Sequence, residues 1–220
     1  MKTLFAYFIF SVLAALTVSN SYASVLSEKE KEGLRLMREE EKLAHDVYIV
    51  LYEKWQLPIF NNISGSESRH FEAVGFLLET YAIEDPAYSK AGKFRNSELA
   101  LLYDSLTARG VGSLVAALEV GAFIEEVDIQ DLQGLLDQNP NNTIAMVYQN
   151  LLRGSQNHLR AFTGQLAFRE GNYTPKVLNE DVYQDIVSSE HQRGNGVNCM
   201  SQNRMRTGKG RQKIRNCMNR

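Results

Sequence analysis

Apolar residues recur at every third or fourth position along most of the chain, and this spacing predicts α-helices. Three of the four prolines, Pro58, Pro86 and Pro140, fall between the periodic stretches, and no long stretch alternates as a strand would. We expect four long helices, with a shorter one before the third. They are predicted at about 27–55, from 58 to just before 84, at 97–109, at about 113–137, and from just after 142 to near 171.

This pattern predicts an all-α fold, a bundle of four long helices. Ser27 and Glu30 have the spacing of a capping box at the start of the first helix. The bundle is expected to occupy residues 24–171, followed by a C-terminal extension at 172–220.

Ionisable residues interrupt the apolar stripe of every long helix, near its middle. An unpaired charge in such a place is very costly, so a set that recurs on all four helices indicates a common partner. Carboxylates and imidazoles are ligands of divalent metal ions, and two such ions would neutralise four carboxylates. The sequence therefore predicts a dinuclear metal centre. Its predicted ligands are Glu41, Glu67, His70, Glu125, Asp128 and His158.

Other interpretations remain open for single residues. Glu67 follows Ser64 by three positions, which is also the spacing of a capping box. A lone buried histidine is more often a hydrogen-bonded core residue than a ligand. Two choices rest on helical phase alone, Glu41 over Glu40 and Glu125 over Glu126.

Four strings give a specific resemblance: "MREEEKLAHDVY", "FNNISGSESRHFEAVGFLLETY", "ALEVGAFIEEVDIQDL" and "VYQNLLRGSQNHLRAF". Over about residues 30–170 they resemble an exported, mostly bacterial family of the ferritin-like superfamily, catalogued as domain of unknown function 2202. Glu41 with Tyr48 seven residues later is similar to the first helix of ferritins, and "ESRH" matches their Glu-x-x-His. The resemblance implies a ferritin-like bundle with a di-iron carboxylate centre.

The chain departs from this pattern on the fourth helix, where Ser155 stands in place of the glutamate that normally precedes the histidine by three residues. Asp128, one turn after Glu125, would replace that carboxylate from the third helix. If it does not, the second metal is held weakly, and the centre is mononuclear or absent.

The resemblance implies oxidation that depends on O₂ or peroxide, as in a ferroxidase or a rubrerythrin-like peroxidase. Two Fe ions are the expected cofactor, and Mn, Zn or Cu also suit the ligands. Tyr48 is the candidate catalytic residue, through a hydrogen bond to a ligand carboxylate or as a one-electron donor; a packed core tyrosine is the alternative. The chain has no Cys-x-x-Cys, so an enzyme would need an external electron donor.

Two further functions remain open: metal binding without catalysis, and a metal-free bundle whose basic tail binds an anionic partner. The tail at 191–220 holds eight basic residues and no acidic one, so the preceding chain has 16 basic against 26 acidic side chains. The only cysteines, Cys199 and Cys217, lie in this tail and are predicted to pair in an oxidising compartment. No Gly-rich nucleotide loop, nucleophile elbow or zinc-finger spacing is present.

The pattern of residues 1–23 predicts a signal peptide. Lys2 precedes an apolar run from Leu4 to Val18, which is short for a membrane span, and small residues favour cleavage after Ala23. We therefore expect a periplasmic or secreted protein.

Overall fold

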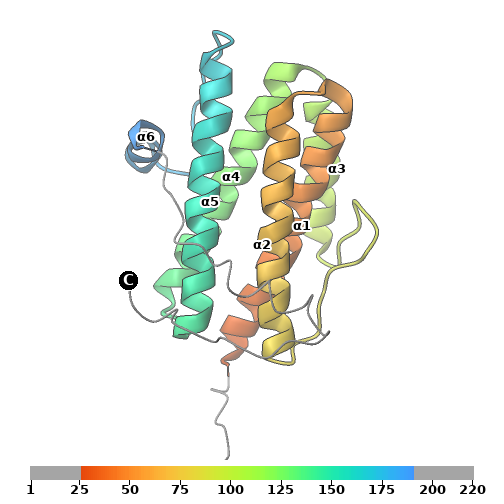
Figure 1. The fold of residues 1–220 in the computed structure, drawn as a ribbon, viewed down its shortest axis with the longest axis vertical. Coiled ribbons are helices and arrows are strands. Elements are labelled where there is room, and N and C mark those ends of the chain that lie inside the picture. The colour runs from red at the N-terminus through yellow and green to blue at the C-terminus, as the bar shows by residue number, and fades with distance from the viewer. Residues whose placement is uncertain (1–25, 191–220) are drawn as a thin grey trace, which may run out of the picture.

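The computed structural model describes residues 26–190, and this part of the chain is helical, without strands (Figure 1). The all-α prediction is therefore confirmed. The helices are α1 (Glu28–Trp55), α2 (Pro58–Thr80), α3 (Ser97–Gly110), α4 (Leu114–Asp137), α5 (Asn142–Ala167) and α6 (Glu180–Ser188).

The four long helices form a bundle of two antiparallel pairs, α1 with α2 and α4 with α5. Helix α2 also packs against α5, and α1 against α4. Residues 81–113, which include α3, return the chain along the length of the bundle, so α2 and α4 run in the same direction (Figure 1). Helix α3 packs against α1 and α4.

Local hydrogen bonds set the helix ends. The hydroxyl of Ser27 accepts from the backbone N–H of Glu30, whose carboxylate accepts from the backbone N–H of Ser27, so the predicted capping box is present. The fourth long helix was expected to end near Gly171 but ends at Ala167. The chain turns there because Glu170 adopts a left-handed conformation with φ of 59° and Gly171 N–H bonds back to Leu166.

Helix α6 was not predicted. It begins after Asn179, whose side chain accepts from the backbone N–H of Val182, and it packs against α5. Its buried residues are Tyr183 and Ile186, and its nine residues are shorter than the window of about 11–18 residues over which a helical period is recognised.

Two apolar clusters fill the bundle, one toward each end. The first, the Tyr48 cluster, includes Tyr48, Phe60 and Phe162. The second, the Met37 cluster, includes Met37 and Val74. Each long helix contributes to both clusters, and on α1, α2 and α5 the predicted ligands lie between the two contributions. On α4 one residue of the Tyr48 cluster, Ile129, follows the predicted ligands. The ionisable residues thus form a polar layer across the middle of the bundle.

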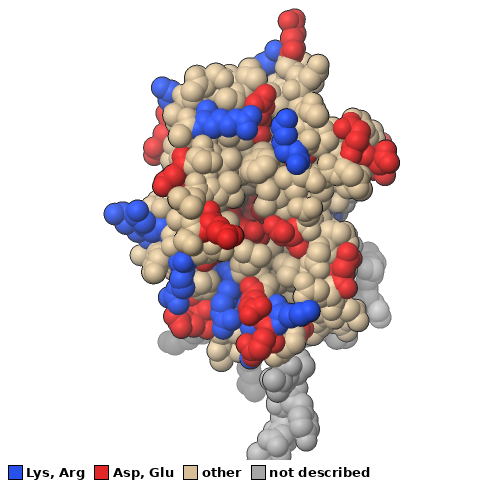
Figure 2. Space-filling model, turned by 180° about the vertical axis from the view of Figure 1, so that it is seen from behind, with Lys and Arg blue, Asp and Glu red and all other residues tan. Residues whose placement is uncertain are grey.

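Acidic side chains also gather on the outside. Figure 2 shows the face opposite to the one that α2 and α5 form in Figure 1, and acidic side chains surround a depression near the middle of this opposite face. None of the helices in residues 26–190 is long and apolar enough to cross a membrane. The predicted signal peptide, the basic tail and the Cys199–Cys217 pair lie outside the described residues.

Candidate metal centre

Glu67 is the middle of the polar layer. Its side chain is fully buried on α2, and each of its carboxylate oxygens faces a different imidazole. Oε2 lies 2.7 Å from Nδ1 of His70, three residues further along the same helix. Oε1 lies 2.7 Å from Nδ1 of His158 on α5. One carboxylate therefore connects two candidate nitrogen ligands.

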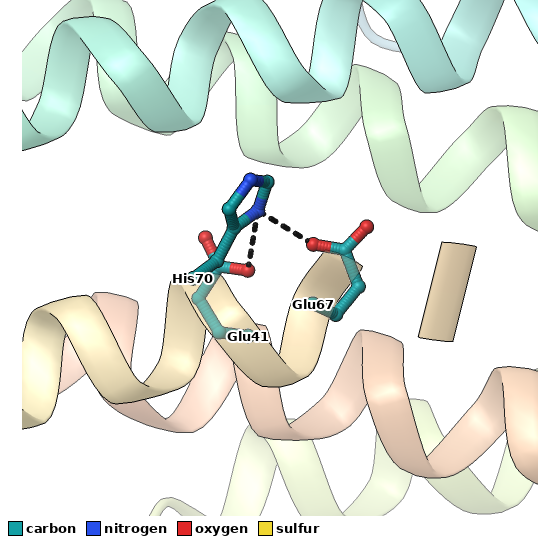
Figure 3. A group of neighbouring side chains, drawn as sticks. All are labelled: Glu41, Glu67 and His70. Carbon is teal, nitrogen blue, oxygen red and sulfur yellow. Dashed lines mark ion pairs between the residues drawn. The ribbon is translucent and has the colours of Figure 1, made fainter. Parts of the chain in front are cut away.

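Glu41 from α1 completes a group around the first histidine. Nδ1 of His70 lies 3.3 Å from Oε2 of Glu41 and points toward both carboxylates (Figure 3). One ligand atom each from Glu41, Glu67 and His70 lie within 4.8 Å of one another, which is compact enough for a single metal ion.

Glu125 from α4 completes a second group of the same kind. Its Oε2 lies 3.4 Å from Nδ1 of His158, and Glu67, Glu125 and His158 also offer ligand atoms within 4.8 Å. The rings of His70 and His158 stack with centroids 5.8 Å apart. Two ligand groups that share Glu67 are suited to two adjacent cations.

The buried ligand atoms have no hydrogen-bond partners. The contacts of the two Nδ1 atoms with carboxylates are short, but they lack hydrogen-bond geometry. Leaving such groups unsatisfied in a protein interior costs about 1–3 kcal/mol each, and more for charged groups. A divalent cation would satisfy all of them at once. The unpartnered atoms are both oxygens of Glu41 and Glu67, Oε2 of Glu125, Oδ2 of Asp128, and Nδ1 of His70 and of His158.

The protonation states follow from burial and mutual charge. Burial raises the pKa of Glu41 to about 8, although the charge of His70 opposes this. Burial alone would also raise the pKa of Glu67, but the charges of His158 and His70 outweigh it and lower the pKa below its usual range. Burial alone would lower the pKa of His158, but Glu67 and Glu125 raise it to about 10. Without metal, Glu67 is thus a carboxylate between two imidazolium rings, and a metal ion would replace their protons.

Tyr48 touches this layer from the apolar side. Its hydroxyl donates to Oε1 of Glu125 at 2.6 Å and lies 3.3 Å from the carbonyl of Gly121. Its ring packs against Phe60 and Phe162, with centroids 6.4 and 5.3 Å away. Burial raises the pKa of Tyr48 well above its usual range, so the phenol keeps its proton. The side chain is therefore both a packed core residue and a hydrogen-bond donor to a candidate ligand.

The sequence matches the family described as "Uncharacterized protein domain (DUF2202)" over residues 30–190. This chain belongs to the DUF2202 family. The match extends through α6, beyond the stretch that carried the resemblance. An uncharacterized protein of Methanocaldococcus jannaschii is 49% identical to it over 170 residues, covering 77% of this chain and 92% of that protein. The crystal structure of a hypothetical protein from Methanococcus jannaschii matches the fold with a TM-score of 0.75 at 48% identity, covering 76% of this chain and 96% of that one.

In this DUF2202 chain Asp128 lies beside the two groups but belongs to neither. It is 2% exposed, and after burial itself the charges of Glu41 and Glu125 contribute most to raising its pKa well above the usual range. Ser155 is fully buried on α5, and its hydroxyl donates to the carbonyl of Leu151 at 3.3 Å. Among the described residues, His158 is therefore the one candidate ligand that α5 provides.

The structure settles three orientations that the sequence left open. Helix α2 begins at Pro58, so Glu67 is in mid-helix and the capping-box interpretation is wrong. Glu41 joins a ligand group, whereas Glu40 contacts Asp131 on α4. Glu126 points away from the centre and accepts from the backbone N–H groups of Lys176 and Val177, at 2.7 and 2.9 Å.

Sequence reasoning missed Gly154 on α5. A Cβ atom at this position would lie 2.5 Å from Cε1 and 2.7 Å from Nε2 of His70. The missing side chain therefore makes room for an imidazole from another helix. Periodicity gives no signal for such a role, because the partner lies on α2.

Proposed function

We propose that this protein is a ferritin-like metalloprotein with a dinuclear centre, most suited to iron, that carries out O₂- or peroxide-dependent oxidation. The observation that carries the proposal is Glu67, whose two oxygens each face a different histidine within a separate carboxylate–histidine group. The single long crossover between α2 and α4 supports the ferritin-like assignment, because this connection is typical of that fold.

The residues present fit two ions. Glu41 and His70 would hold one, Glu125 and His158 the other, and Glu67 would bridge them. Asp128 would supply the oxygen ligand that Ser155 lacks. The buried atoms of these side chains that lack a hydrogen bond support the assignment, since a cation would give each of them a partner.

Iron bound here would supply the one-electron chemistry with O₂ or peroxide that the side chains lack. Tyr48 would orient Glu125 and keep a proton beside its Oε1. The apolar clusters on both sides exclude water from the layer. The side chains of His70 and His158 are 14% and 12% exposed, so a small oxidant would approach past them. The same proposal includes an external electron donor. It also includes a periplasmic or secreted location, which the predicted signal peptide at residues 1–23 favours.

Ser155 favours a second candidate function, metal binding without turnover. With a serine where ferritin-like enzymes carry a carboxylate, the second ion has fewer strong ligands, and the protein would hold or buffer Fe, Mn, Zn or Cu.

Metal content tests both functions. The chain from Ser24 onward, loaded anaerobically with Fe(II) and desalted, should retain about two irons by elemental mass spectrometry. Glu67→Ala/His70→Ala should retain almost none, whereas Glu72→Ala, an exposed control on α2, should match the unmodified chain. Absorbance changes on adding O₂ or peroxide would then separate oxidation from buffering. Near-zero content with Fe, Mn, Zn and Cu alike would refute a metal centre.

A further inference from the structure

A narrow cleft enters the bundle between α1, α3 and α4, away from the two histidines. Its cavity volume is about 10 Å³, room for about one water molecule, and its walls are mostly apolar, with Leu99 and Leu102 from α3 and Phe123 from α4. Two acids, Glu40 from α1 and Asp128 from α4, also line it. None of its lining residues is basic.

The two acids are buried and incompletely paired. Glu40 is 6% exposed and Asp128 is 2% exposed, and Oε2 of Glu40 and Oδ2 of Asp128 have no hydrogen-bond partner. The half-buried Asp131, nearly one turn beyond Asp128 on α4, contacts the carboxyl group of Glu40. Figure 2 shows acidic side chains around a depression on the face behind α2 and α5.

The inner end of the cleft adjoins the candidate metal centre. The charges of Glu41 and Glu125 act most strongly on Asp128, and that of Glu40 acts on it next. Glu40 precedes Glu41 in the sequence, so one turn of α1 presents one acid to the cleft and the next to the centre. Asp128 therefore lies between the cleft and the candidate metal centre.

We propose that this cleft is the entry route for divalent cations, with Glu40 and Asp131 as a transit site and Asp128 as the connection to the centre. The inference rests on the proposed metal centre. Carboxylates alone hold a borderline divalent cation such as Fe(II) or Zn(II) less firmly than a site that also has imidazoles, so such an ion would pass inward. An entering cation would displace the proton from a carboxyl group of the cleft, as metal ions do at their ligands. Ionised acidic groups in a cleft with low-dielectric walls concentrate cations and raise association rates by about 10- to 1,000-fold.

Stopped-flow uptake of Co(II), followed by its visible absorption, tests the route by blocking it. Leu102→Trp narrows the cleft, whereas Leu101→Trp places the same bulk on a neighbouring side chain that is 71% exposed and does not line it. We expect Leu102→Trp to slow uptake about tenfold or more with an unchanged final amount of bound cobalt, and Leu101→Trp to have no effect.

Charge removal gives an independent comparison. Glu40→Gln/Asp131→Asn should slow uptake without changing the final cobalt content, and the exposed control Glu72→Gln should not. Unchanged rates in both the blocked and the uncharged variant would overturn the route. Loss of bound cobalt in Glu40→Gln/Asp131→Asn would make these residues ligands of the centre and overturn the transit role. If the unmodified chain binds no cobalt, both the metal centre and the route are refuted. The measurement on the unmodified chain alone therefore separates this outcome from failure of the route only.

Discussion

Replacing Gly154 with alanine tests the geometry of the proposed metal centre through a residue that is not itself a candidate ligand. The new Cβ atom would lie 2.5 Å from Cε1 of His70, so the ring must move by roughly 0.9 Å to restore an ordinary contact near 3.4 Å. A functional constellation tolerates displacements of only about 0.5 Å. The shifted imidazole therefore no longer matches the carboxylates of Glu41 and Glu67.

Gly164→Ala is the matched control on the same helix, because nothing lies within 4 Å of its added Cβ. Alanine in a helix interior is more stable than glycine by about 1 kcal/mol. At Gly154 the same gain is opposed by about 1–3 kcal/mol of overpacking. A domain of this size changes its melting temperature by about 2–4 °C per kcal/mol. We thus expect Gly164→Ala to melt about 2–4 °C higher, and Gly154→Ala to melt at or below the parent.

The deciding assay is metal titration of both variants with Co(II) or Zn(II), followed by competition with a chelator. Gly154→Ala should lose affinity for one ion by about 10- to 100-fold, as when the surroundings of a ligand are disturbed, while the ion beside His158 is retained. Gly164→Ala should bind both ions as the parent does. Equal affinities in the two glycine variants would refute the placement of His70 as a ligand.

Three further outcomes are expected. Glu67→Gln should lose both ions and Glu125→Gln about one of the two, by elemental analysis, because only Glu67 belongs to both groups; equal losses would contradict a bridging Glu67. Tyr48→Phe should destabilise the metal-free protein to urea by about 1–3 kcal/mol, since Oε1 of Glu125 loses its donor; an unchanged midpoint would contradict this. The metal-free protein should lose stability as the pH rises, because folding raises the pKa of Glu41 from 4.5 to about 8 and that of His158 from 6.5 to about 10. The stability that each group contributes is complete below its pKa in the unfolded chain, and it is lost as the pH rises through its pKa in the folded protein. Urea midpoints that rise between about pH 6 and 9 would therefore refute the assignment of these two pKa shifts.

The helices were predictable because each long one carries a continuous apolar stripe. Helix α6 was not, because Glu126 and α5 hold its segment in place by contacts distant in sequence. Helix α5 ends earlier than predicted for a similar reason. Glu170 adopts a left-handed conformation in the turn after the helix, and the spacing of apolar residues does not indicate such a conformation.

Helical phase was informative at the two ambiguous pairs for a geometric reason. Adjacent residues on a helix point about 100° apart, so the two members of a pair face different neighbours even though all four side chains are buried. Glu41 and Glu125 turn inward, and their neighbours turn to other segments. The sequence did not indicate which carboxylate faces which imidazole, because this depends on how α2 packs against α5.

The polar layer is compatible with a stable fold because the two apolar clusters lie on either side of it. Each long helix is anchored at both ends by buried apolar side chains, so its middle turn remains in place even though the carboxyl groups there gain little from the protein itself. Metal binding, as proposed, would then add free energy to a bundle that is already assembled, and would do so only in the folded state. For that reason a variant that removes Glu67 should leave the helices folded while it abolishes the stabilisation that added metal gives. Circular dichroism melting with and without Zn(II) separates the two effects: equal stabilisation of the parent and of Glu67→Gln by zinc would show that the ions bind elsewhere.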